Sequence, residues 1–496
     1  MDLFSLEEKL SSFGSGGFYL LETFLIQLLK LEAKANSQEL IVEKHQAWDA
    51  FAPKGLGKIH QPLYIEISQN FNLKKLNVIA KRVNSKGSQE FNLLLVSTRH
   101  VAKSKEALEN IPSELFNRVY VWDGDKIQSL MNEHREAVKS ILDNLFSTHL
   151  KMAVSRRADE WQTDREILIK DLTEKYHDGR FSLILGAGVS SSAGLPDWDT
   201  LLNSLFVAML TDENLRDSAS DNDQVSSIVR RLRKVDGPSA LMLARYIRKG
   251  LSAGSTAEQN IFIKSVTQQL YSLRNKSFSL RSPLIREIAS LCTPTRTGAK
   301  VHAILTYNFD DLIERELEER GLLFRSIFEE IEIPAQEELP IYHVHGFLPE
   351  DRSKYSNLDR CTLVFSEEGY HQIYGDAYHW SNLVQLGGLK ENVCLLIGLS
   401  LTDPNLRRLL EISSKSLDKP KHYAFLQRLN LEKFKGEEHG SPIRAPLQMV
   451  TRFLDRHHSL NEELMRELGI NVIWYETYDE IPKILSRIGK VSTTNP

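Results

Sequence analysis

The stretch that most constrains the fold of this chain is LILGAGVSSSAGLPDWDT, residues 183–200. An apolar run ends here in a Gly-Ala-Gly tripeptide at 186–188. Glycine permits a tight turn and lets backbone N–H groups approach an anion, because no Cβ stands in the way. The pattern predicts a buried strand, a turn that is a candidate phosphate loop, and a helix. The GxGxxG fingerprint of dehydrogenases does not fit, because position 191 is Ser191. The plain alternative is a tight strand-to-helix turn without a ligand.

Three further stretches place polar side chains where a predicted strand ends. They are TYNFDDLIE at 306–314, HVHG at 343–346 and IGLSLTDPNLRRLL at 397–410. The carboxyl ends of parallel strands share one edge of a sheet, which is where such folds bind ligands. We therefore expect the four stretches to converge on one site.

Each of these polar residues also has a purely structural explanation. Asp310 could be a helix cap, and His345 could be a hydrogen-bonded core histidine. Ser400 and Asp403 could cap the helix PNLRRLL. Four such coincidences at equivalent topological positions are less expected than one, which favours the site.

Short apolar strands alternate with amphipathic helices from about residue 180 onward. Such alternation predicts an α/β fold with a doubly wound, mostly parallel sheet. The strand candidates are 180–190, 301–308, 340–346, 393–400, 421–427 and 470–476.

The first part of the chain predicts a smaller α/β domain. It has one strongly apolar helix candidate, 18–31, and strand candidates at 63–68, 76–83, 91–98 and 118–124. The stretch that follows has helical periodicity and is rich in charge, which predicts a helical connector. The predicted domains are 1–126, a helical connector at 127–175, and 176–496.

Composition excludes several classes of protein. A chain of 496 residues is too long for one ordinary domain, and a net charge of −4 argues against a chain built around nucleic-acid backbone. Its three cysteines form no CxxC pair, so we expect no disulfide framework, no four-cysteine zinc site and a reducing compartment. The acidic start MDLFSLEEKL lacks secretory features, and no apolar run approaches the ~20 residues that span a bilayer. We expect a cytoplasmic protein without membrane contact.

Taken in order, GAGVSxxxGLPDW, TYNFDDLIE, VHG and IGLSLTDPNL resemble the sirtuin-like superfamily. They are most similar to its bacterial branch of defence-associated NAD hydrolases. The resemblance covers about residues 155–490, including FSEEGY at 365–370 and the closing GINVIWYE. It implies a Rossmann-like domain that consumes NAD⁺ as a glycohydrolase, releasing nicotinamide and ADP-ribose. It also implies a regulated effector of anti-phage defence that acts by NAD⁺ depletion.

The resemblance implies roles for individual residues. Asn308, beside the nicotinamide ribose, and His345, of the His-Gly pair, match the catalytic positions. The implied substrate-binding residues are Gly186, Ala187, Gly188 and Ser190 around the diphosphate, Asp310 facing the carboxamide, Gly398 and Ser400 at the adenosine half, and also Thr306 and Asp403.

Two departures put peptide deacylation in doubt. Protein-deacylating sirtuins carry two CxxC pairs that bind zinc, and three isolated cysteines do not build that module. Those enzymes also have a Phe-Arg pair after the proline of the first motif, whereas this chain has Asp197 and Trp198. The NAD half of the reaction is retained.

The implied residues suit cleavage of a glycosidic bond whose leaving group is already a cationic pyridinium. No general acid is needed; the protein must favour an oxocarbenium-like transition state and place a water. Asn308 offers donor and acceptor groups for water or a ribose hydroxyl, and Asp310 is suited to hold the carboxamide rotated. His345, expected to titrate near neutrality, would accept a proton from the water or a ribose hydroxyl.

The stretch WDAFAPKGLGKIHQPLYIEIS at 48–68 weakly resembles a degenerate restriction-endonuclease-like domain. Asp49 and Glu66, with Glu22, would form a hard-oxygen site for Mg²⁺. The position that should hold lysine is Ser68, although Lys81 is a substitute candidate. A lysine there would orient water and stabilise the pentavalent phosphate, and serine carries no charge for that role, so we expect neither nuclease activity nor Mg²⁺ as a cofactor. Alternatively, the carboxylates belong to a half-exposed strand and a turn.

A domain of this kind is better suited to binding than to cleavage. We expect it to contact nucleic acid, a regulatory partner protein or a second copy of the chain. Two alternatives to the NAD hydrolase are a non-catalytic NAD or ADP-ribose sensor that gates the N-terminal domain, and a metal-dependent nuclease. The joint presence of Asn308, Asp310 and His345 disfavours the sensor, and Ser68 disfavours the nuclease.

Overall fold

The structure is a computed structural model. Its description covers residues 2–14, 16–42, 48–69, 71, 76, 79, 92–98, 119–155, 161–211, 240–251, 256–330, 332–415, 417, 419–435 and 445–490. The predicted strand at 76–83, apart from Leu76 and Ile79, and the candidate Lys81 lie outside the described residues. No helix in the described ranges is long and apolar enough to cross a membrane.

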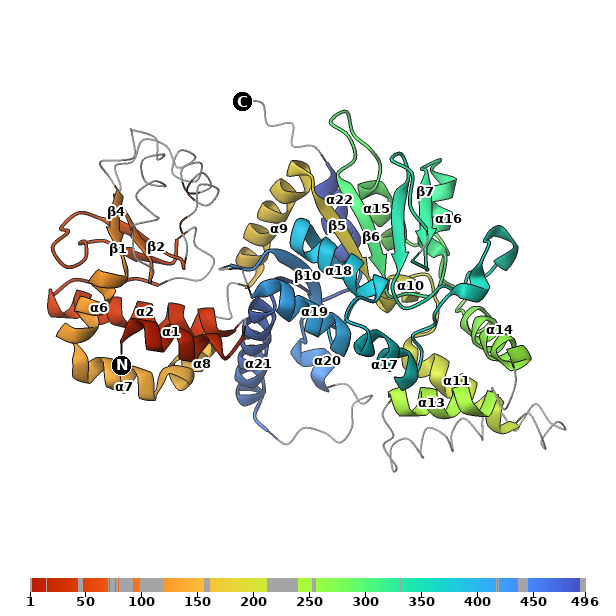
Figure 1. Ribbon diagram of the computed structural model, residues 1–496, viewed down its shortest axis with the longest axis horizontal. Coiled ribbons are helices and arrows are strands. Elements are labelled where there is room, and N and C mark those ends of the chain that lie inside the picture. Colours follow the sequence, from red (N-terminus) through yellow and green to blue (C-terminus); the bar gives the residue numbers. More distant parts are fainter. Residues whose placement is uncertain are drawn as a thin grey trace. The chain divides into compact units, whose positions relative to one another are not determined.

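Two compact units make up the chain (Figure 1). Unit 1 comprises Met1–Asp164, Ser414–Pro420 and Lys435–Gly469. Unit 2 comprises Arg165–Ser413, Lys421–Phe434 and Ile470–Pro496. After leaving unit 1, the chain enters it again twice, so the two units are not continuous stretches of sequence. The predicted domain boundaries at residues 126 and 175 divide the sequence, not the spatial units, and they stay a prediction.

Unit 1 is built around a four-stranded sheet of order β1-β2-β3-β4. β1 pairs antiparallel with β2, whereas the β2–β3 and β3–β4 pairs are parallel. The strands are β1 Ala50–Ala52, β2 Leu63–Ile67, β3 Asn92–Val96 and β4 Val119–Trp122. The sheet confirms the strands predicted at 63–68, 91–98 and 118–124. The restriction-endonuclease-like character of this unit stays a prediction.

Helices of unit 1 share a hydrophobic core with this sheet. The helices are α1 Leu3–Ser11, α2 Gly16–Ala35, α6 Gly124–Glu133, α7 Arg135–Asp143, α8 Leu145–Ser155 and α21 Leu447–Glu467. The apolar helix predicted at 18–31 is α2, and its Phe24, Leu28 and Leu29 are fully buried. Helix α21, from the far end of the chain, packs against α8. The predicted connector is helical as expected, with α6–α8 in the unit 1 core.

Unit 2 is built around a seven-stranded sheet of order β11-β10-β9-β5-β6-β8-β7. All six neighbouring pairs are parallel, which confirms the predicted α/β fold with a doubly wound sheet. The strands are β5 Phe181–Leu185, β6 Val301–Thr306, β7 Phe324–Ile327, β8 Leu339–His343, β9 Val393–Ile397, β10 His422–Gln427 and β11 Ile470–Tyr475. The strand β7, a four-residue edge strand, was not predicted from the sequence.

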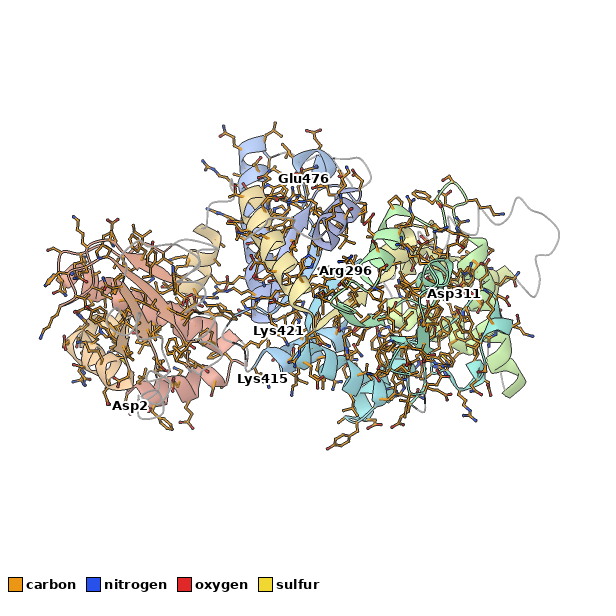
Figure 2. The ribbon with its side chains drawn as sticks, turned by 90° about the horizontal axis from the view of Figure 1, so that it is seen from above. Asp2, Arg296, Asp311, Lys415, Lys421 and Glu476 are labelled. Atoms are coloured by element: carbon orange, nitrogen blue, oxygen red, sulfur yellow. The ribbon has the colours of Figure 1, made fainter. Side chains whose placement is uncertain are left out.

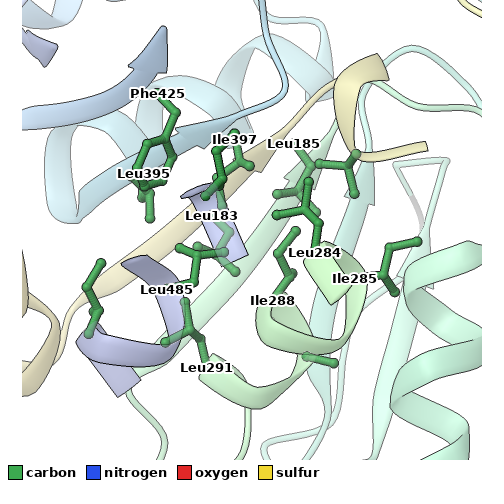
Figure 3. Packing of buried hydrophobic residues seen from close by; sticks show 14 of the residues in the cluster. Leu183, Leu185, Leu284, Ile285, Ile288, Leu291, Leu395, Ile397, Phe425 and Leu485 are labelled. Atoms are coloured by element: carbon green, nitrogen blue, oxygen red, sulfur yellow. The ribbon is translucent and has the colours of Figure 1, made fainter. Parts of the chain in front are cut away.

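Helix layers cover both faces of this sheet. Every residue of β5 is buried, as expected for a parallel strand between two layers. On one face, α15 and α22 pack against Leu183, Leu395 and Ile397 (Figure 3). On the other, α18 lies against β9. The helices are α9 Trp161–Asp178, α10 Ala187–Ser191, α11 Trp198–Thr211, α13 Ala240–Leu251, α14 Thr256–Ser272, α15 Pro283–Leu291, α16 Leu312–Glu319, α17 Glu367–Gly375, α18 Trp380–Glu391, α19 Pro404–Ser414, α20 Leu431–Lys435 and α22 Glu480–Gly489.

The strand order places a topological switch point between β5 and β9. The chain leaves β5 toward β6 on one side and later returns to β9 on the other side. In doubly wound sheets, ligands usually bind outside the carboxyl ends of the strands at such a switch point. The loops after β5 and β9 carry the glycine motifs identified in the sequence.

Candidate active site

The loops after β5 and β9 pack backbone against backbone. The Gly186 N–H donates to the carbonyl of Ile397 at 2.9 Å, and the Gly188 N–H donates to the carbonyl of Gly398 at 2.9 Å. A Cβ on Gly188 would lie 2.8 Å from the Gly398 Cα, and a Cβ on Gly398 would lie 2.7 Å from the Val189 nitrogen. Gly398 also has a φ of +72°. The glycines are therefore needed for the close approach of the two loops.

This pairing gives the predicted phosphate loop a second role. Two of its N–H groups, those of Gly186 and Gly188, already donate to protein carbonyls. A diphosphate that used these N–H groups would have to replace those hydrogen bonds. The predicted contact of 186–188 with the diphosphate therefore stays a prediction.

Asn308 is fixed at the end of β6. Its backbone N–H donates to Thr306 Oγ1 at 3.1 Å, and its side-chain Nδ2 donates to the Gly186 carbonyl at 3.0 Å. The second bond ties Asn308 to the loop after β5. None of the described hydrogen bonds of Asn308 uses the side-chain oxygen, which is the acceptor that this residue can present to a ligand.

Asp310 joins two neighbouring strand-to-helix turns. Ser190 Oγ in α10 donates to Asp310 Oδ2 at 2.5 Å, and the Leu312 N–H at the start of α16 donates to Oδ1 at 3.2 Å. The N-cap of α16 is Asp311, so Asp310 accepts from the first N–H of the helix without being its cap. Burial raises the pKa of Asp310 to about 6, against the two hydrogen bonds that lower it. Asp310 is thus mostly ionised at neutral pH.

His345 lies in a buried aromatic and acidic cluster after β8. Its Nε2 is 3.9 Å from Asp403 Oδ2, and its ring makes edge-to-face contacts with Tyr307 at 4.5 Å and Tyr370 at 5.6 Å between centroids. Burial lowers the pKa of His345 to about 4, although Asp403 opposes the change. The expectation that His345 titrates near neutrality is wrong, because desolvation outweighs one carboxylate at this distance. His345 is neutral at pH 7.

Asp403 and Ser400 have different surroundings. Asp403 caps α19, since the Leu406 N–H donates to its Oδ1 at 2.7 Å, and its Oδ2 accepts from the Tyr370 hydroxyl. Ser400 is exposed, and its hydroxyl pairs with Thr402 at 2.7 Å. The structure therefore brings Asp403, but not Ser400, into contact distance of the histidine cluster.

Several residues near these side chains were not predicted. Tyr307 lies between Thr306 and Asn308 and donates to Gln385 of α18. Asp311, labelled in Figure 2, accepts from Tyr271 at 3.2 Å and from Arg315 at 2.7 Å. The motif TYNFDDLIE contains Tyr307 and Asp311, but their partners come from helices whose packing the sequence does not show.

A buried pair, His343 and Glu314, contacts the backbone of Asn308. His343 Nε2 lies 2.6 Å from Glu314 Oε1, and His343 Nδ1 lies 3.3 Å from the Asn308 carbonyl. Ser326 in β7 donates to the same Glu314 oxygen at 3.1 Å. This chain of polar contacts links the edge strand β7 and its neighbour β8 to the backbone of Asn308.

Comparison with known proteins finds a family match over the residues of this site. Residues 302–442, which include Asn308, Asp310, His345 and Asp403, match the family of SIR2-like domains. The chain carries a SIR2-like domain.

Curated relatives extend the similarity beyond that domain. The chain is 24% identical over 333 residues to the NAD(+) hydrolase ThsA of Enterococcus faecium, covering 66% of this chain and 59% of the relative. It is 23% identical over 329 residues to the NAD(+) hydrolase ThsA of Bacillus cereus (strain MSX-D12), covering 65% and 56%. A protein of the same name from Cytobacillus dafuensis is 22% identical over 339 residues. The chain thus spans a little more than half the length of these relatives.

Unit 1 holds the acidic residues considered for a metal. Lys419 Nζ lies 3.0 Å from Asp49 Oδ1 and 2.8 Å from Glu66 Oε1. Burial opposes the charge of Lys419, but the two carboxylates outweigh it and raise its pKa. A divalent cation between Asp49 and Glu66 would have to displace this ammonium. Across the described ranges, no group of three or more His, Cys, Asp or Glu side chains is arranged to hold a metal ion.

Glu22, the third acidic candidate, is also paired with a cation from the C-terminal part of the chain. Arg466 Nη2, in α21, lies 2.9 Å from Glu22 Oε2, and the Arg466 guanidinium lies over the Tyr19 ring at 4.5 Å. Arg466 Nη1 also lies 3.6 Å from Glu463 Oε1. Each carboxylate of the predicted acidic set is therefore paired with a cation, Lys419 or Arg466.

Gly398→Ala tests the packing of the two glycine loops. The new Cβ would meet the Val189 nitrogen at a backbone conformation that favours glycine, so we expect unit 2 to lose roughly 1–3 kcal/mol of stability. Urea denaturation of the purified chain measures the loss. Gly387→Ala is the matched control, because Gly387 lies in α18 with open space around its Cα, and it should be neutral or slightly stabilising. Equal stability of both variants would contradict this role of Gly398.

Lys419→Met tests the charge pairing in unit 1. It leaves Asp49 and the buried Glu66 without their shared counter-ion, and because Lys419 is 37% exposed we expect a loss of roughly 1–3 kcal/mol rather than the full cost of a broken buried pair. The double variant Lys419→Met, Glu66→Gln should recover part of the loss. Thermal and urea unfolding measure both. The exposed Lys415 provides the control Lys415→Met. If Lys419→Met is as stable as that control, the pair contributes nothing.

Proposed function

We propose that the SIR2-like domain cleaves NAD⁺ to nicotinamide and ADP-ribose. The observation that carries this proposal is the gathering of Asn308, Asp310 and His345, all buried and polar, at the carboxyl ends of β6 and β8. They lie beside the switch point of the sheet, where doubly wound folds bind nucleotides. The names of the similar curated proteins, NAD(+) hydrolases, support the same reaction.

The reaction is a hydrolysis at C1′ of the nicotinamide ribose. The C1′–N bond breaks, and its electron pair goes to the pyridinium nitrogen, which gives neutral nicotinamide. The oxygen of a water forms the new bond to C1′, and the proton of that water passes to a base and then to solvent. The positive charge on the leaving group makes a general acid unnecessary, so a site without paired acidic and basic carboxylates is sufficient.

The three residues divide the remaining work. The Asn308 amide oxygen orients the water or a ribose hydroxyl, while the amide nitrogen is held by Gly186. Asp310, ionised above about pH 6, accepts from the nicotinamide carboxamide. His345 is neutral at pH 7, so its ring can accept the proton that the water loses.

We further propose that the whole chain is a regulated effector of anti-phage defence. NAD⁺ depletion would kill the host cell if the activity were not controlled, so the proposal includes a trigger. Unit 1 is the candidate surface for that control, through a second copy of the chain or a regulatory partner; nucleic acid is a further candidate. The proposed site of action is the cytoplasm, where the substrate NAD⁺ is present and thiols stay reduced. The free cysteines Cys292, Cys361 and Cys394 are consistent with a reducing compartment.

Asn308→Ala and His345→Ala test the hydrolase. Each should lower nicotinamide release by at least about 100-fold, since each removes a group that acts on the transferred water. NAD⁺ loss and nicotinamide release are measured with the purified protein and in cells challenged with phage. Leu323→Ala, at a side chain that is 65% exposed, is the control and should behave as wild type.

Two results would overturn the assignment in different ways. Retained turnover in either variant would remove that residue from the catalytic machinery. NAD⁺ that is bound but stays intact, both in the tube and in challenged cells, would favour the nucleotide sensor instead.

A further inference from the structure

We propose that Asp403 is a positioning residue that acts through His345, and that the Tyr370 hydroxyl holds the Asp403 carboxylate in place. The inference rests on the proposed function in one respect, because it takes His345 as the proton acceptor. It assigns to Asp403 a role other than contact with the substrate.

The geometry of the cluster carries the proposal. The two oxygens of Asp403 have different partners: Oδ1 accepts from the Leu406 N–H at 2.7 Å, and Oδ2 accepts from the Tyr370 hydroxyl. The carboxylate is thereby fixed at both ends, with Oδ2 3.9 Å from His345 Nε2. Tyr370 contacts both members, because its ring also lies edge-on to the histidine.

The Nε2 atom of His345 is poised for a ligand. Within the part of the chain that the structure describes, this buried atom has no hydrogen-bond partner. At 3.9 Å, Asp403 is too far to accept a hydrogen bond, yet near enough to interact with a positive charge. Nε2 can therefore take a proton from a bound water while Asp403 stabilises the imidazolium that forms.

The other charged and titratable groups around His345 do not compete for this role. Burial raises the pKa of Tyr307 and the pKa of Tyr370, so both phenols stay protonated at neutral pH. Tyr374 stacks on Tyr370 at 6.3 Å between centroids, and the Arg408 guanidinium lies over Tyr374 at 5.0 Å. Asp403 is the anion that faces the histidine in this cluster.

The charge matters because His345 is buried. Burial lowers its pKa to about 4, and Asp403 acts in the opposite direction. Protonation during the reaction therefore creates a cation in a desolvated place, where an unpaired charge is costly. Loss of the carboxylate would lower the pKa of His345 further and weaken it as a base.

Asp403→Asn separates this role from helix capping. Asparagine caps a helix as well as aspartate, so a merely structural Asp403 would leave turnover and melting temperature unchanged. We expect instead a fall in kcat of about 10- to 100-fold with little change in KM, and a shift of the acid limb of kcat/KM to lower pH. Asp403→Glu, which keeps the charge, should recover part of the activity.

Tyr370→Phe tests the hydroxyl. It keeps the ring against His345 and removes the donor to Asp403, so we expect a smaller fall in kcat than for Asp403→Asn. Tyr378→Phe, at a tyrosine that is 80% exposed, is the control. A Tyr370→Phe enzyme with wild-type kcat would remove Tyr370 from the proposal.

A measurement that needs no turnover keeps the pairing separate from the proposed function. Histidine side-chain NMR of the full chain, with the His345 signal identified by its loss in His345→Gln, gives the pKa of His345. Asp403→Asn should lower that pKa. If the pKa falls but the wild type releases no nicotinamide, the pairing stands and the hydrolase does not. If nicotinamide is released and Asp403→Asn changes neither kcat nor the pKa, the positioning role is overturned.

Discussion

The contact between the loops after β5 and β9 is the constraint on which the site depends. Gly188 and Gly398 meet with their backbones, and no side chain fits between them. This contact lies at the switch point of the sheet. Through the Gly186 carbonyl it also fixes the amide of Asn308, which belongs to a third loop. A residue that broke the contact would disturb Asn308 without touching it.

Burial explains most of the chemistry at this edge of the sheet. It raises the pKa of Asp310 to about 6 and lowers the pKa of His345 to about 4. Both shifts reflect the cost of holding a charge away from water: His345 avoids this cost by being neutral at pH 7, whereas Asp310 stays mostly ionised and is supported by two hydrogen bonds. The same desolvation makes it costly to form a new charge here during a reaction. Neighbours that stabilise a charged group, such as Ser190 beside Asp310 and Asp403 beside His345, are therefore important.

The features of the fold that depend on local sequence patterns could be predicted from the sequence. A glycine turn after an apolar strand, and the polar residues that end the next strands, were enough to place Asn308, Asp310 and His345 at one sheet edge. The edge strand β7 was missed because four residues give too short a pattern. The pKa of His345 was misjudged because desolvation depends on side chains such as Tyr370, which the fold brings from elsewhere. Lys419 lies 353 positions from Glu66, and no local pattern connects them.

The pairing in unit 1 bears on what an N-terminal domain of this kind can do. An ammonium between Asp49 and Glu66 pairs with both carboxylates, but it cannot polarise a phosphate or activate a water as Mg²⁺ does. Ser68, where a nuclease needs a lysine, agrees with that limitation. The two cations paired with the acidic set, Lys419 and Arg466, come from segments that lead directly into β10 and β11. These ion pairs therefore hold together parts of unit 1 that are far apart in sequence.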